Sequence, residues 1–141
     1  MSRPAPGTLL WIALAPGKAA LAKVLHAQHD SVMLGVADQL FDGVALPAPL
    51  PPFVTKHFLH AKDASAEDGA ITKAGRDAAP IDARSTTRVR GGAVYIQSDK
   101  VRAWIPGKDK LPMDTPTTAH ALVAALLARL GLPAPARPKR P

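Results

Sequence analysis

Three short apolar runs separated by tight turns near the amino terminus most constrain what this chain can fold into. The runs are Thr8–Leu14, Ala19–Ala27 and Ser31–Ala37. The first turn, Ala15–Lys18, has proline and glycine in its middle positions, as a type II turn favours, and Gln28–Asp30 provides the second turn. Short apolar runs with this punctuation predict a β-meander.

The second run also fits a helix, because Leu21, Val24 and Leu25 recur at helical spacing. A helix over residues 18–28 therefore stays open as an alternative to a strand. After the third run, residues 38–52 are expected to form a loop with a proline-rich end. Phe53–His60 is expected to be a fourth strand.

The middle of the chain is weakly patterned. Residues 61–82 are polar and alanine-rich, and a short helix is expected near residues 64–68. Residues 84–92 are expected to form a basic loop. The segments 93–98 and 101–105 flank Asp99-Lys100, and they predict a β-hairpin.

The last predicted element is a helix that starts at Thr115 as N-cap, with Pro116 at its first position, and stops at Gly131 and Pro133. Its apolar positions form one helical stripe, which consists of Ala119, Leu122, Val123, Leu126, Leu127 and Leu130. We expect this stripe to pack on the sheet. The fold class is therefore α+β, with an antiparallel β-sheet and a C-terminal helix packed on it.

The length of 141 residues fits one domain. Residues 1–6 are a proline-rich leader, residues 7–131 are expected to be a single globular domain, and residues 132–141 are a proline-rich basic tail that is expected to be disordered. The chain has no cysteine, which excludes disulfides and zinc–thiolate sites and suits a reducing cytoplasm. No run approaches the ~20 apolar residues of a membrane-spanning helix.

The formal net charge of +7 is unevenly distributed. Four of the seven excess charges lie in the two proline-rich ends, on Arg3, Arg137, Lys139 and Arg140. The remaining body is only mildly basic, so the high isoelectric point does not by itself imply a broad nucleic-acid face.

Histidine pairs at metal-site spacing occur twice, as His57/His60 and His26/His29. A metal site needs three or four convergent ligands, and on a strand His57 and His60 point to opposite faces. The chain also has no Gly-x-Ser-x-Gly elbow and no phosphate-binding Gly-Lys loop. We therefore expect a binding protein rather than an enzyme, with no metal and no cofactor.

Most candidate binding residues lie in two segments that we expect to be exposed loops on a rigid scaffold, and Arg102 lies nearby in the predicted hairpin. Arginines would pair directionally with carboxylates, and an aromatic side chain would anchor the contact unless Phe41 folds back as a plug of the core. The candidates are Asp38, Gln39, Phe41, Asp42, Arg88, Arg90 and Arg102.

Six short segments, in this order, carry a family resemblance: Gly7–Leu9, Gly17–Ala19, Val32–Asp38, Phe53–Val54, Ala70–Gly75 and Val94–Asp99. Together they cover roughly residues 7–105, and the chain resembles immunity protein 26 of polymorphic toxin systems. The resemblance implies an SH3-like, strongly bent antiparallel β-sheet or barrel with helical additions. It also implies a protein that binds a cognate toxin, encoded by the adjacent gene, and blocks the toxin's active surface.

A different function remains open. The chain could be an SH3-like module that binds nucleic acid or another macromolecule through the basic region 84–102 and the basic tail. A hydrolytic or other enzyme is a third, less favoured reading.

Overall fold

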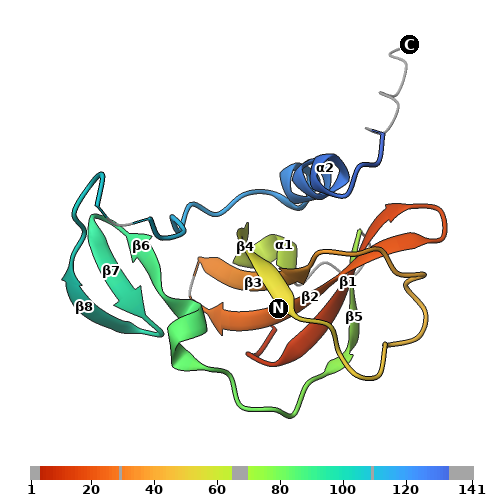
Figure 1. The fold of residues 1–141 in the computed structure, drawn as a ribbon, viewed down its shortest axis with the longest axis horizontal. Coiled ribbons are helices and arrows are strands. Elements are labelled where there is room, and N and C mark those ends of the chain that lie inside the picture. The colour runs from red at the N-terminus through yellow and green to blue at the C-terminus, as the bar shows by residue number, and fades with distance from the viewer. Residues whose placement is uncertain (1–3, 29, 65–69, 109, 134–141) are drawn as a thin grey trace.

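The computed structural model describes residues 4–28, 30–64, 70–108 and 110–133. Five strands form an antiparallel sheet in the order β4-β3-β2-β1-β5 (Figure 1). They are β1 (Thr8–Ala15), β2 (Lys18–Ala27), β3 (Ser31–Ala37), β4 (Phe53–His60) and β5 (Ile71–Arg76). The predicted meander and fourth strand are confirmed.

Strand β2 resolves the alternative between helix and strand over residues 18–28 in favour of the strand. Its residues from Ala19 to Leu25 are all buried, because both faces of this central strand are covered. The sequence also fitted a helix because apolar residues on a strand buried on both faces form a continuous run, which includes positions at helical spacing.

Helix α2 (Ala119–Arg129) covers one face of this sheet (Figure 1). Its buried Leu122, Leu126 and Leu127 belong to the same apolar cluster as Ile12 and Leu34, so the predicted packing of the leucine stripe is confirmed. The opposite face carries Leu9, Trp11 and Leu21 together with Phe53 of β4, and Phe41 and Leu50 pack against it. The loop between β3 and β4 thus contributes to the core.

The predicted start of the helix is wrong. Its N-cap is Thr118, whose Oγ1 accepts a hydrogen bond from the backbone N–H of Ala121 at 3.1 Å. Thr115 and Pro116 lie outside the helix, because the next residue, Thr117, exchanges two backbone hydrogen bonds of 2.9 Å with β4. The chain therefore pairs with β4 at Thr117 before the helix begins at Ala119.

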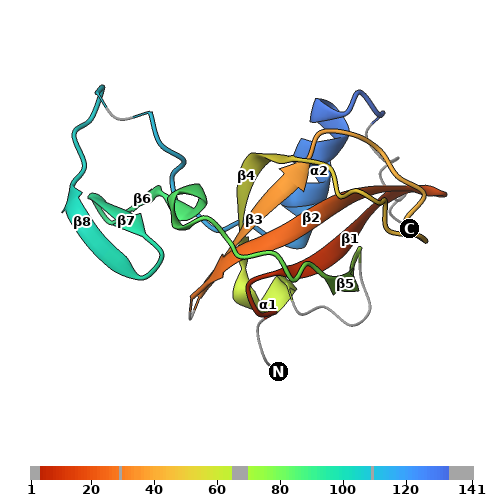
Figure 2. The same cartoon turned by 60° about the horizontal axis from the view of Figure 1, so that its bottom comes forward.

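A second, three-stranded sheet lies at one end of the molecule (Figures 1 and 2). It has the order β6-β7-β8 and follows the short helix η1 (Ala83–Thr86). Its strands are β6 (Arg88–Arg90), β7 (Ala93–Ile96) and β8 (Asp99–Ala103). The prediction of a basic loop over residues 84–92 is therefore wrong, since this segment contains η1 and β6.

The predicted hairpin exists, but its turn lies two residues earlier than expected. Gln97 and Ser98 form the turn, and Gln97 adopts a positive φ of 55°. Asp99 and Lys100, which were expected in the turn, begin β8. A left-handed conformation is uncommon for residues other than glycine, so the sequence did not predict a turn at Gln97.

The described strands form an open sheet, with β4 and β5 as its two edges, so the closed-barrel alternative is wrong. Within the described ranges a short helix, α1, spans Ala61–Ala64. The helix expected near residues 64–68 falls mostly outside those ranges, as do residues 1–3 of the leader and 134–141 of the tail. No helix among the described residues reaches the length and apolar content that crossing a bilayer requires.

Candidate functional site

The loop after β3 presents two of its predicted acidic residues in local contacts. Asp38 is exposed and forms a two-point ion pair with Arg129 of α2, at 3.0 Å to Nε and 3.3 Å to Nη2. The carboxylate of Asp42 accepts the backbone N–H of Val44 at 2.9 Å and so closes a turn. Gln39 is exposed. Asp38 and Asp42 therefore have structural partners within the molecule.

Phe41 folds back onto the sheet. Its ring centroid lies 5.9 Å from that of Trp11, and its backbone exchanges hydrogen bonds of 2.8 and 2.9 Å with Ala19 at the start of β2. Phe41 therefore packs into the core and does not form the exposed anchor that was the alternative.

Arg88 is buried rather than exposed, with 1% of its surface accessible. Its Nε lies 3.6 Å from Asp114 Oδ2, its Nη1 donates to the carbonyl of Thr86 at 2.9 Å, and its guanidinium lies 5.9 Å from the centroid of the Tyr95 ring. Burial lowers the pKa of Arg88, and the charge of Asp114 opposes this effect. The prediction of Arg88 in an exposed loop is wrong, because β6 turns this side chain inward.

Arg90 shares the same carboxylate and reaches the larger sheet. Its Nη1 donates to Gln28 Oε1 at 2.7 Å and to Asp114 Oδ2 at 3.2 Å, and its Nη2 contacts both carboxylate oxygens of Asp30. Burial acts to lower the pKa of Arg90, but these hydrogen bonds raise it overall. Asp114 also accepts from Ser31 Oγ at 2.7 Å. These contacts join the two sheets.

The two halves of the predicted binding surface lie far apart in the molecule. The loop that begins at Asp38 lies at the end of the large sheet where β3 stops, beside α2. Strand β6, with Arg88 and Arg90, lies at the other end in both ribbon views (Figures 1 and 2). The structure therefore does not bring these candidates together in one mixed-charge surface.

Strand β8 carries the seventh candidate and is the most exposed strand. All five of its residues are exposed, including Arg102, whose Nη1 contacts the carbonyl of Ala103 at 3.2 Å. Val101 is 50% exposed, and Ile105, just beyond the strand, is 49% exposed. The sequence predicted Val101 and Ile105 to lie in a hairpin but gave them no role, because no local pattern indicated that they would be exposed.

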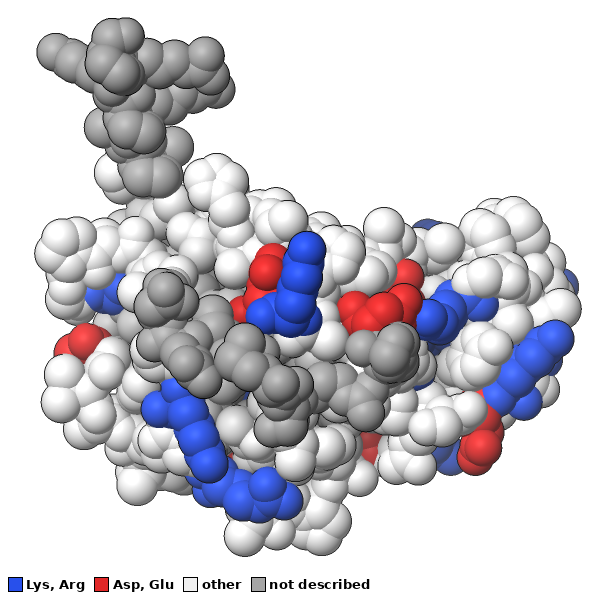
Figure 3. Space-filling model, turned by 180° about the vertical axis from the view of Figure 1, so that it is seen from behind, with Lys and Arg blue, Asp and Glu red and all other residues white. Residues whose placement is uncertain are grey.

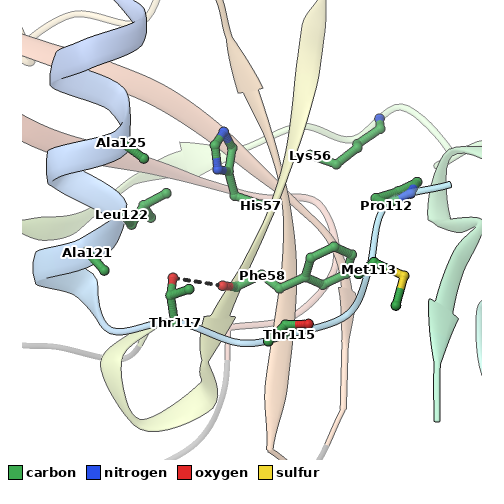
Figure 4. A pocket seen from close by; sticks show the side chains of 10 residues that line it. All are labelled: Lys56, His57, Phe58, Pro112, Met113, Thr115, Thr117, Ala121, Leu122 and Ala125. Carbon is green, nitrogen blue, oxygen red and sulfur yellow. Dashed lines mark hydrogen bonds between the residues drawn. The ribbon is translucent and has the colours of Figure 1, made fainter. Parts of the chain in front are cut away.

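A pocket of about 290 Å³ lies between β4, α2 and the segment 112–117 (Figure 4). His57 and Leu122 face one another across it, and Met113 closes one side. Burial, assisted by the positive charge of Arg129, lowers the pKa of His57. Its Nε2 lies 3.2 Å from Thr55 Oγ1.

Charged side chains are scattered on the face seen in Figure 3. Lys and Arg atoms and Asp and Glu atoms form several small groups within uncharged surface on this face. Within the same residues, no three His, Asp or Glu side chains gather into a possible metal site; His29 lies outside them.

Comparison with known proteins identified no matching family model, no similar curated protein and no similar solved structure. Inferences about function therefore depend on the exposed surfaces of the chain itself. Two of them stand out: strand β8 with its exposed apolar side chains, and the pocket beside β4.

Proposed function

We propose that this chain is an immunity-type protein that binds a cognate toxin and blocks the toxin's active surface. The observation that carries the proposal is strand β8, which exposes all of its residues and includes the half-exposed Val101. Exposed apolar side chains rimmed by polar ones are typical of protein interaction sites. Neutralisation would be steric and would require no chemistry from this chain.

The charges next to Val101 indicate which kind of partner surface β8 would contact. Lys100 and Arg102 flank Val101 on the same strand, and both are exposed. Arg102 lies opposite Val94 and Lys100 lies opposite Tyr95, so the two cations lie on opposite faces of the small sheet. Exposed cations near an apolar residue favour a partner with an acidic or mixed surface, because complementary charges increase association rates and disfavour wrong partners. The proposed binding surface is therefore β8, and Arg102 is the one sequence-predicted candidate that lies on it.

The way the small sheet is held supports a binding role for β8. Asp114 ties β6 to the larger sheet through Arg90 and Ser31, so the hairpin is fixed before a partner arrives. A preorganised surface loses less conformational entropy on binding. The meander with a fifth strand against β1 is compatible with the SH3-like bend that the family resemblance implies, and this finer assignment is part of the proposal.

Nucleic-acid binding is the second candidate, because four exposed cations belong to the same region: Lys100, Arg102, Lys108 and Lys110. About four phosphate contacts would make the affinity fall by roughly 10²-fold between 50 and 200 mM salt. A protein interface with a buried apolar centre would depend far less on salt. The salt dependence therefore separates the two candidates.

The test is a titration against the protein product of the adjacent gene, with DNA and RNA as controls. The double variant Val101→Asp, Arg102→Glu should weaken binding by at least about 30-fold, equivalent to ~2 kcal/mol. The matched control is Val44→Asp, Lys18→Glu, which makes the same changes at residues that are exposed away from β8. It should bind like the wild type.

Both double variants should melt within a few degrees of the wild type, because every changed side chain is exposed. Equal binding by the two double variants would remove β8 from the interface. Salt-sensitive binding to DNA or RNA, with no binding to the neighbouring product, would replace the toxin by nucleic acid as the partner.

A further inference from the structure

Strand β4 is an edge of the large sheet, and only its last part is paired on the outer side. The carbonyl of Phe58 accepts from the backbone N–H of Thr117, and the N–H of His60 donates to the carbonyl of Thr117, both at 2.9 Å. Backbone groups on a strand alternate in direction. Lys56, two residues before Phe58 in unbroken register with Gly35 of β3, therefore also directs its N–H and C=O outward.

Among the described residues, no backbone group pairs with the outer side of Lys56. The segment that contains Thr117 leaves the edge at this point and crosses to the small sheet, where Asp114 donates to the carbonyl of Val89 at 2.7 Å. The pocket of about 290 Å³ opens where the segment diverges from β4. An edge strand with free donors and acceptors is a template for another strand.

The side chains around this edge differ on its two faces. Lys56 extends on one side of β4, whereas His57 lies on the other side and faces α2 (Figure 4). The described residues include no carboxylate that pairs with the Lys56 ammonium group, and burial lowers the pKa of this residue. On the α2 side, Leu122 and Ala125 present an apolar wall.

We propose that the outer edge of β4 binds an extended segment of a partner protein whose side chains run apolar, acidic, apolar. The acidic residue would lie opposite Lys56 and pair with its ammonium group, because directly opposed residues share a face of a sheet. Its two neighbours would point to the other face and enter the pocket beside Leu122 and Ala125. Main-chain hydrogen bonds would provide affinity, and the alternating side chains would provide specificity.

Other occupants fit this edge less well. Two copies of the chain that paired β4 against β4 would bring like-charged Lys56 side chains together, which is unfavourable. The last residues of this chain are basic, with Arg137, Lys139 and Arg140, and have no carboxylate side chain to offer Lys56. The site is separate from β8 and does not depend on the toxin proposal.

The probe is a phage-displayed library of random heptapeptides, selected against the full-length protein. Selected peptides should share an acidic residue between two apolar ones. Lys56→Met removes the charge but keeps the N–H, and it should weaken the selected peptide about tenfold. Lys56→Pro also removes the outward N–H, which an edge strand tolerates, and it should abolish detectable binding.

Two controls keep the result specific. The β8 variant Val101→Asp, Arg102→Glu should bind the peptide like the wild type, so failure of the toxin proposal leaves this result untouched. Melting curves must show that Lys56→Pro is folded; if it is not, Lys56→Met alone decides.

Three results of the peptide experiments would overturn the proposal: no enriched peptide, enriched peptides without an acidic residue, or peptides that bind Lys56→Met as tightly as the wild type. A wild-type dimer in sedimentation that Lys56→Pro converts to monomers would also overturn it, because the edge would then belong to a second copy of the chain.

Discussion

The two sheets of this molecule are held together by different kinds of contact. The five-stranded sheet buries apolar side chains on both faces, under α2 on one side and under Phe41 and Leu50 on the other. In the three-stranded sheet, the largest fully buried side chain is a cation, Arg88. The larger sheet is stabilised mainly by removing apolar area from water, whereas the smaller one depends on satisfying buried charge.

The buried charges of the smaller sheet meet at the carboxylate of Asp114. Its side chain is 1% exposed, and it faces Arg88, Arg90 and the hydroxyl of Ser31. A charge buried this deeply is favourable only while its partners are in place. The smaller sheet should therefore be more sensitive to one polar substitution than to the loss of one apolar side chain.

The largest predicted effect follows from that carboxylate. Asp114→Ala leaves Arg88 buried without its counter-ion and should lower the free energy of unfolding by about 3–5 kcal/mol. Urea unfolding would measure the total. Amide hydrogen exchange should show the earliest loss of protection in β6, β7 and β8, because a local network fails before the apolar core does.

The control for this substitution is Asp99→Ala, which removes an exposed carboxylate from β8 and should change stability by less than ~0.5 kcal/mol. Equal loss of protection in both sheets of Asp114→Ala would show that they unfold as one unit. The contrast between the two regions would then not hold in solution.

The second effect probes the apolar region. Leu126 is 1% exposed in the cluster between α2 and the large sheet, so Leu126→Ala should open a cavity and cost about 2–5 kcal/mol. Denaturant melts would measure it, with Val44→Ala at an 83% exposed position as control. A change below ~0.5 kcal/mol would mean that the leucine stripe does not carry the packing of this face.

Much of the larger region could be predicted from the sequence because its signals are local. Turns after Leu14 and Ala27 fixed the meander, and leucines at helical spacing identified the packed face of α2. The smaller region was poorly predicted for the opposite reason. The environment of Arg88 depends on Asp114, far along the chain, and no local pattern announces that pair.

The candidate site followed the same division. Asp38 and Arg88 were predicted to form one binding surface because both were expected in exposed loops. In the structure Asp38 pairs with Arg129, and Arg88 lies near Asp114. One signal was available: Arg88 and Arg90 alternate around Val89, a spacing that places both side chains on one face of a strand. The unpaired edge at Lys56 could not be read from sequence, because it depends on where the 112–117 segment leaves β4.

The third prediction concerns the boundary between that segment and α2. Thr118→Ala removes the side-chain acceptor for Ala121 and should cost about 1 kcal/mol. Thr115→Ala, at an exposed residue outside the helix, should cost less than ~0.5 kcal/mol. Chemical denaturation of both variants would distinguish the two N-caps; a larger loss for Thr115→Ala would restore the start predicted from the sequence.

The smallest effect tests the one buried cation of the larger sheet, Lys23 on β2, whose Nζ lies 2.7 Å from Asp77 Oδ2. The hydrogen bond from Lys23, followed by the backbone N–H of Ala79, lowers the pKa of Asp77 below its ordinary value of 3.8. A carboxyl group with a lowered pKa in the folded state stabilises the fold at pH values above 3.8, and this contribution disappears as the pH falls through the folded pKa.

Asp77→Asn should therefore lose up to about 1 kcal/mol at pH 7 and converge with the wild type in acid. Urea melts from pH 7 down to about 2 would measure both curves, and Asp99→Asn controls for the loss of one negative charge. A deficit of Asp77→Asn that stayed constant down to the lowest pH would show that the contact stabilises by packing of the Lys23 chain rather than by charge. Packing rather than charge would then stabilise the larger sheet even at its one buried cation, Lys23. The contrast with the smaller sheet, which depends on the charges around Asp114, would be sharper.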